Sequence, residues 1–212
     1  MTLGNVLIFG DSYSTYKGYI PEGYAIYYGI EENEICGVKN VQMTWWHQLM
    51  EETGSRIVQN NSWSGSTVCY TGYNGDCSTT SSFIYRLECL EKEEFHKKNA
   101  IDTVLVFGGT NDSWCGAEVG ETVDGSVTRE ERRKVLPAFC HFASELKRVF
   151  SESRIVFIVN TELNPTISEG IERVCEMYDA ECVLLKDIDK INGHPSAVGM
   201  IQIKDQIKEK LS

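Results

Sequence analysis

The sequence contains no apolar run that approaches a membrane-spanning helix, which needs about 20 apolar residues. Its N-terminus, Met1-Thr2-Leu3-Gly4-Asn5, also lacks the basic stretch and apolar segment of a signal peptide. We therefore expect a cytoplasmic protein. No internal repeat, low-complexity tract or linker divides the 212 residues, so we expect one domain, residues 1–212, with a sizeable core.

Basic residues are scarce relative to acidic ones: 20 Lys and Arg stand against 31 Asp and Glu, and the net charge is −11. Binding to nucleic acid rests on cations that neutralise phosphates. Anionic membrane surfaces likewise attract basic segments. The composition therefore predicts neither a nucleic-acid nor a membrane partner, and a neutral or cationic small molecule is easier to reconcile with this charge.

None of the 8 cysteines belongs to a C-x-x-C pair or to a Cys/His cluster with zinc-ligand spacing. Several of them, Cys140 and Cys182 among them, fall inside helical or strand patterns. This placement favours reduced and mostly buried thiols over disulfide bridges.

Five short apolar runs alternate with helical patterns along the chain, at residues 6–9, 56–59, 103–107, 155–159 and 182–185. Val, Ile and Phe dominate most of these runs, which is typical of strands buried on both faces. The alternation predicts an α/β fold in which helices cover both sides of a parallel sheet.

The expected helices are read from apolar periodicity and capping residues. They cover residues 44–53, 82–95, a short helix opened by the capping box at Thr128, 137–150, 164–178 and the segment after Pro195. Two long segments do not fit short connections: the tyrosine-rich residues 13–43 and the Gly/Ser/Thr-rich residues 63–82. Long loops at this edge of a sheet usually form binding walls or lids.

The first strand runs directly into Gly10-Asp11-Ser12. Glycine permits a sharp turn there, and open α/β sheets bind their ligands beyond the carboxyl ends of the strands. Ser12 is therefore a candidate nucleophile, although a Gly-Asp-Ser sequence is also ordinary turn chemistry.

Polar residues follow three further strands at the same edge. They are the segments 60–66, 108–112 and 193–196, which contain Gly65, Asn111 and His194. Ester hydrolysis needs a nucleophile, a base and donors for the oxyanion. His194 is the histidine at a strand exit and is a candidate base. The backbone N–H groups of Ser12 and Gly65 and the side-chain amide of Asn111 are candidate oxyanion donors.

Gly10-Asp11-Ser12, Gly65, Gly109-Thr110-Asn111-Asp112 and His194-Pro195 resemble, in order, the motif blocks of the SGNH (GDSL-like) hydrolases. The resemblance implies a flavodoxin-like three-layer α/β/α sandwich around a five-stranded parallel sheet. It implies an esterase, lipase, thioesterase or carbohydrate deacetylase that uses no metal or other cofactor. By position, Ser12 is the nucleophile, Gly65 and Asn111 are oxyanion donors and His194 is the base.

The sequence departs from the family at one position. An aspartate usually lies three residues before the histidine, and here that residue is Ile191. Asp189 is a tentative substitute. A backbone carbonyl or a water molecule, or another acid, are the remaining candidates for orienting His194. Because losing the acid of a related triad costs roughly 10⁴-fold in rate, the departure also fits a catalytically impaired binding module.

The expected substrate is a small-molecule ester, with an acylated carbohydrate as one candidate. A lysophospholipase or thioesterase of the same family is an alternative. No glycine-rich phosphate loop follows the first strand, so the sequence does not indicate a nucleotide ligand.

Asp112 is expected to form hydrogen bonds with the backbone of a neighbouring loop. The remaining assignments concern aromatic residues: Trp45 and Trp46 are expected in the core, Trp63 and Trp114 in either core or site, and Tyr24, Tyr27 and Tyr28 in a pocket wall.

Overall fold

Five parallel strands form one sheet in the order β2-β1-β5-β6-β7. Their bounds are Asn5–Gly10 for β1, Arg56–Ser62 for β2, Thr103–Phe107 for β5, Arg154–Val159 for β6 and Glu181–Leu184 for β7. The computed structural model describes residues 2–212. This strand order is that of flavodoxin-like folds, so the predicted fold class is confirmed.

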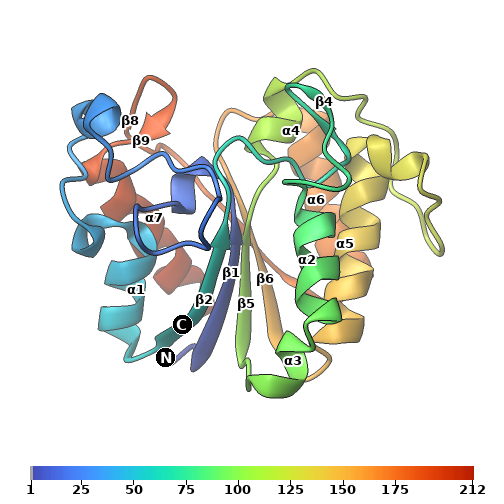
Figure 1. Cartoon of the computed structure of the whole chain (residues 1–212), viewed down its shortest axis with the longest axis horizontal. Helices are drawn as coiled ribbons and strands as arrows, with labels where there is room; N and C mark the ends of the chain where they lie inside the picture. Colours follow the sequence, from blue (N-terminus) through green and yellow to red (C-terminus); the bar gives the residue numbers. More distant parts are fainter. Residues whose placement is uncertain (1) are drawn as a thin grey trace.

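Helices cover both faces of the sheet (Figure 1). On one face lie α1 (Trp45–Thr53) and α7 (Ala197–Leu211), and on the other lie α2 (Phe83–Lys92), α5 (Val135–Val149) and α6 (Pro165–Met177). Strand side chains alternate between the two resulting cores, since successive residues point to opposite faces. Leu7 and Phe9 enter one core, and Val6 and Ile8 enter the other.

Capping residues set several helix starts where the sequence predicts them. Thr44 accepts from the backbone N–H of His47 at the start of α1. Asn164 caps α6, whose first residue is Pro165. These caps satisfy N–H groups that have no partner within the helix.

Three predicted elements differ from the structure. Thr128 and Glu131 do form the capping box, but only the 3₁₀ turn η4 (Glu131–Arg133) follows, because Lys134 is extended with ψ of 148°. The helix expected over residues 82–95 ends at Lys92, and a positive φ of 56° at Glu94 separates it from α3 (Phe95–Lys98). Strand β2 continues through the polar residues up to Ser62.

The two long segments fold as short elements at the carboxyl edge of the sheet, the upper edge in Figure 1. They include η1 (Ser12–Ser14), η2 (Glu31–Cys36), η3 (Val41–Met43) and the hairpin of β3 (Thr71–Gly72) and β4 (Gly75–Asp76). Helix α4 (Thr110–Trp114) and the hairpin of β8 (Lys190–Ile191) and β9 (His194–Pro195) lie at the same edge. The predicted convergence of polar segments is therefore present.

Trp45 and Trp46 lie in the core, as predicted, and are almost fully buried. Their indole N–H groups donate to the backbone carbonyls of Tyr13 at 3.2 Å and Ser14 at 2.9 Å. Helix α1 thus fixes the backbone that follows Ser12.

Candidate active site

Ser12 lies directly after β1, in the 3₁₀ turn Ser12–Ser14, and its exposed fraction is 5%. Gly10 allows this turn for a reason other than the predicted one. It keeps an ordinary strand backbone, but a Cβ at this position would collide with the side chains of Ser62 and Ser14. The strand can therefore deliver Ser12 only if residue 10 has no side chain.

His194 is hydrogen-bonded to Ser12: its Nε2 lies 3.0 Å from Ser12 Oγ. The other ring nitrogen, Nδ1, lies 3.3 Å from the backbone carbonyl oxygen of Asn192. A carbonyl only accepts hydrogen bonds, so Nδ1 carries the proton and Nε2 presents its lone pair to the Ser12 hydroxyl. The antiparallel pairing of Ile191 with His194 closes the hairpin that makes this contact.

Three tyrosines hold this hairpin in place. The ring of Tyr27 stacks on the imidazole of His194, with centroids 3.5 Å apart and planes 7° from parallel. The hydroxyls of Tyr13 and Tyr28 donate to the carbonyl oxygens of the residues before and after His194. Of the tyrosines predicted in a pocket wall, Tyr27 therefore orients the histidine, whereas Tyr28 is 1% exposed and belongs to the core.

Asp189 does not make the contact tentatively assigned to it. Its carboxylate accepts from the hydroxyl of Ser196, the residue that caps α7. Ile191 packs against the core on the α1 and α7 side of the sheet. Of the candidates for orienting His194, the structure places the Asn192 carbonyl at Nδ1, because the tight β8–β9 turn brings that carbonyl back onto the ring.

Burial lowers the pKa of His194 below its ordinary value. The hydrogen bond to the Asn192 carbonyl opposes this change, and the positive charge of Lys190 adds to it. Lys190 is held by Glu162, whose carboxylate lies 3.0 Å from Nζ. Because burial disfavours the charged imidazolium, His194 stays neutral down to a lower pH than a free histidine would.

Asn111 is linked through Ser66 to the loop that carries Gly65. Gly65 has a φ of 79°, is exposed, and has no atom within 4 Å of where a Cβ would lie. The amide Nδ2 of Asn111 donates to the carbonyl oxygen of Ser66 at 2.9 Å. Since an amide has two N–H donors, this bond leaves one of them for a ligand.

Two buried carboxyl groups brace these loops. Asp112 accepts from the backbone N–H groups of Val68 and Cys69 at 3.0 Å, which confirms its predicted structural role. Asp11 accepts from the N–H of Tyr13 at 3.0 Å. Burial raises the pKa of Asp11 to about 7, and the charge of Asp112 contributes to this rise.

Arg86 is a supporting residue that the sequence interpretation missed. It is 1% exposed, and its guanidinium donates to the carbonyls of Gly10 at 3.2 Å and Asn61 and to the hydroxyl of Ser66 at 3.1 Å. It also stacks on Phe83, with 4.3 Å between the guanidinium carbon and the ring centroid. One side chain thus ties the serine strand to the loop that carries Gly65. The available signal was a charged residue on the apolar face of an amphipathic helix.

Two tryptophans lie in the segments at the carboxyl edge of the sheet. Trp63, which follows β2, packs on Tyr24 with ring centroids 4.3 Å apart. Trp114 is 42% exposed, and its ring lies 3.2 Å from where a Cβ on Gly193 would be. Neither Trp63 nor Trp114 is a buried core residue, so both belong to the site loops.

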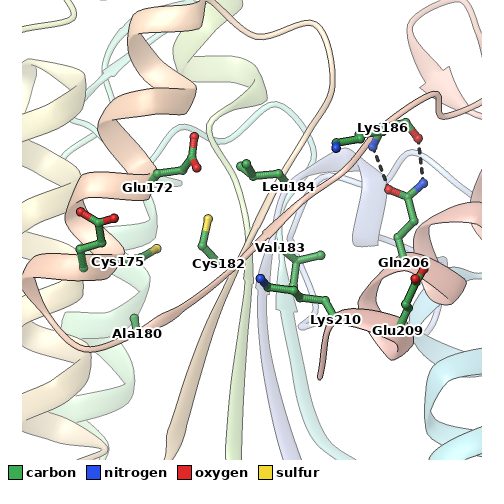
Figure 2. Close-up of a pocket in the computed structure, with 11 residues that line it drawn as sticks. Glu172, Cys175, Ala180, Cys182, Val183, Leu184, Lys186, Gln206, Glu209 and Lys210 are labelled. Carbon is green, nitrogen blue, oxygen red and sulfur yellow. Dashed lines mark hydrogen bonds between the residues drawn. The ribbon is translucent and has the colours of Figure 1, made fainter. Parts of the chain in front are cut away.

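A groove of about 650 Å³ lies away from these residues, along the edge strand β7 (Figure 2). Its walls include Cys182 and Leu184 of β7 and Gln206 of α7. Gln206 exchanges two hydrogen bonds with the backbone of Lys186, at 2.8 and 2.7 Å, and both residues line the groove. None of the predicted site residues lines this groove.

Within residues 2–212, no cluster of three His, Cys, Asp or Glu side chains is placed to hold a metal ion. Across the same residues, no helix combines the length and apolarity needed to cross a bilayer. The eight cysteines are free thiols.

The fold and the Ser12–His194 pair define an α/β/α protein with a serine and a histidine at the carboxyl edge of its sheet. The profile of the GDSL-like lipase/acylhydrolase family matches residues 4–211. The chain therefore belongs to this family of ester hydrolases. Comparison with curated proteins gives no match.

Two solved structures are similar over nearly their whole length. A protein from Bacteroides ovatus assigned to the GDSL-like lipases is 36% identical, with a TM-score of 0.90 and coverage of 100% of this chain and 99% of that chain. One from Bacteroides uniformis with the same assignment is 38% identical, with a TM-score of 0.87 and coverage of 97% and 94%. An acetyl xylan esterase from Butyrivibrio proteoclasticus has the same fold, with a TM-score of 0.66 and 16% sequence identity. The match covers 100% of this chain and 64% of that chain.

Proposed function

We propose that this protein is a serine esterase in which Ser12 is the nucleophile and His194 is the general base. The proposal is carried by the 3.0 Å hydrogen bond between Ser12 Oγ and His194 Nε2. A neutral imidazole that accepts from a hydroxyl is positioned to take its proton. The Asn192 carbonyl on Nδ1 supports the required tautomer without a carboxylate.

In the acylation step, Ser12 Oγ attacks the acyl carbon of the ester while its proton passes to His194 Nε2. The carbonyl electron pair moves onto oxygen, and the resulting oxyanion accepts from the N–H groups of Ser12 and Gly65 and from the Asn111 amide. When the intermediate collapses, the bond to the alcohol breaks and His194 returns its proton to the leaving oxygen. Ser12 then carries the acyl group as an ester.

In the deacylation step, water attacks the acyl-Ser12 ester and gives one proton to His194. The second tetrahedral intermediate uses the same donors and expels Ser12 Oγ, which takes the proton back from His194. The products are a carboxylic acid, an alcohol and the regenerated serine. This scheme draws only on groups of the chain and on water.

The substrate that we propose is an ester of a small acyl group on a polar alcohol such as a carbohydrate. Trp63 with Tyr24, and the exposed Trp114, offer flat apolar surfaces with polar edges in the segments at the carboxyl edge of the sheet. The net charge of −11 disfavours anionic lipid surfaces. An acetyl xylan esterase with the same fold is consistent with this class.

A fluorophosphonate probe tests the nucleophile, because it phosphonylates a serine activated by a base. We expect intact-mass labelling of the wild type and of Ser64→Ala, a half-exposed loop serine, and none of Ser12→Ala. Turnover of a short-chain chromogenic ester should follow the same pattern. A folded wild-type protein without labelling or turnover would instead indicate a binding module.

A panel of acetylated sugars, acyl thioesters and a lysophospholipid tests the substrate class. We expect the highest kcat/KM on the acetylated sugars. A preference for the thioester or the lysophospholipid would overturn the proposed class while leaving the nucleophile assignment intact.

A further inference from the structure

Tyr73 touches the candidate oxyanion residue from outside the motif blocks. It lies in the turn of the β3–β4 hairpin, between Gly72 and Gly75, and is 53% exposed. Its hydroxyl donates to Asn111 Oδ1 at 3.2 Å. An exposed phenol contributes little to the core, so folding alone does not account for this contact.

The contact bears on which way the Asn111 amide faces. Its Nδ2 donates to the Ser66 carbonyl at 2.9 Å, and its Oδ1 accepts from the Tyr73 hydroxyl. Rotating the amide by 180° would place Oδ1 against the Ser66 carbonyl oxygen, which has no proton to give. The two partners therefore select the same orientation, in which neither of them uses the second N–H of Nδ2.

The hairpin that carries Tyr73 is fixed independently of Asn111. The Thr71 hydroxyl donates to the backbone carbonyl of Arg133 at 2.8 Å. The guanidinium of Arg133 pairs with Asp76 on the second strand of the hairpin, also at 2.8 Å. The tyrosine hydroxyl thus reaches the amide from an anchored support, as a group that orients a catalytic side chain should.

We propose that Tyr73 is a positioning residue that holds the Asn111 amide with one N–H ready for the oxyanion. The assignment rests on the proposed esterase function. Without the Tyr73 hydroxyl, the amide keeps its contact to Ser66 but is free to tilt about it. The oxyanion bond then weakens in the transition state, whereas binding of the intact ester does not depend on it.

Steady-state kinetics of Tyr73→Phe on a short-chain ester test this role. Removing a whole oxyanion donor costs about 10²–10³-fold in kcat, and we expect about a tenfold loss for a donor that is only misdirected, with KM unchanged. Tyr19→Phe is the matched control, because Tyr19 is equally exposed at 50% and contacts Tyr16 and Trp46 instead. It should retain wild-type kcat.

A double-mutant cycle separates positioning from a structural effect. Because Tyr73 acts through Asn111, Tyr73→Phe should have no further effect on kcat in an Asn111→Ala background. An equal loss in both backgrounds, or wild-type kcat for Tyr73→Phe alone, would overturn the proposal. Asn111→Ser provides a second background if the alanine variant does not fold.

The side-chain amide signals of Asn111 in a ¹⁵N-correlated NMR spectrum give a readout that does not depend on turnover. Tyr73→Phe should shift them or average the two N–H signals, and Tyr19→Phe should not. Unchanged signals would overturn the positioning role even if the esterase function holds. A wild type that is neither labelled at Ser12 nor active would remove the esterase function, and the NMR comparison would still decide the contact.

Discussion

Ser12 and His194 meet at 3.0 Å, but the chain supports them in two different ways. The serine side is built from the sheet: Ser12 lies in the turn that follows β1, and the buried guanidinium of Arg86 ties this strand to its neighbour. The histidine side is a short hairpin held by aromatic rings and backbone carbonyls. The reactive pair thus joins a serine fixed by strand pairing to a histidine fixed by side-chain packing.

Removing the base itself should have the largest effect on this pair. His194→Ala leaves the Ser12 hydroxyl without a proton acceptor, and we expect kcat to fall by about 10⁴-fold or more. Fluorophosphonate labelling of Ser12 should be lost with it. Near-ultraviolet circular dichroism checks that the variant is folded, and a folded variant that retains a tenth of wild-type kcat would contradict the role of His194.

Disrupting the serine side should cost stability as well as activity. Arg86→Met removes the guanidinium that donates to the buried carbonyls of Gly10 and Asn61 and to the Ser66 hydroxyl, although Gly10 keeps the N–H of Trp63. Because a hydrogen bond to a charged group contributes about 1.5–3 kcal/mol, we expect the free energy of unfolding to fall by about 3 kcal/mol. Urea denaturation measures this change.

The control for Arg86 is Arg173→Met, an exposed arginine on α6. It should leave the unfolding midpoint and kcat unchanged. Equal stability of Arg86→Met and wild type would show that the guanidinium does not hold the two strand ends together.

Weakening the histidine side should have a smaller effect, confined to activity. Tyr27→Leu removes the ring that stacks on the imidazole, and such aromatic contacts contribute about 0.5–1.5 kcal/mol. We expect roughly a fivefold fall in kcat with little change in unfolding, since Tyr27 is only partly buried. Tyr27→Phe, which keeps the ring, should lose less; equal losses for the two variants would argue against stacking.

The sequence predicted the sheet and the position of Ser12 well, because these rest on local patterns. Buried Val, Ile and Phe runs identify β1, β5 and β6, and a serine directly after a strand can lie only at the carboxyl edge. The positions of Asn111 and Gly65 at this edge were predicted by the same argument, because both residues follow a strand. The placement of Asp112 against the loop backbone was predicted for the same reason.

The histidine side was less predictable because long-range packing decides it. Ile191 indicated that the usual acid was missing, but the choice among Asp189, a carbonyl and another acid depended on how the β8–β9 hairpin turns. Tyr27 was expected in a pocket wall, yet its stacking on His194 joins residues 167 positions apart in the chain (194 minus 27).

On the serine side, Arg86 was missed because burying an arginine requires hydrogen-bond partners from three separate segments of the chain.

The pH dependence of kcat/KM for Asp189→Asn, measured beside the wild type, tests the account most directly. Neutral His194 is the active form, and its pKa is lowered from 6.5, so kcat/KM should fall only as pH drops through a value below 6.5. The amide introduced by this substitution would keep an oxygen acceptor for Ser196, so we predict the same plateau and the same acidic limb for both proteins. A loss approaching the roughly 10⁴-fold cost of removing a triad acid would contradict a histidine oriented by the Asn192 carbonyl.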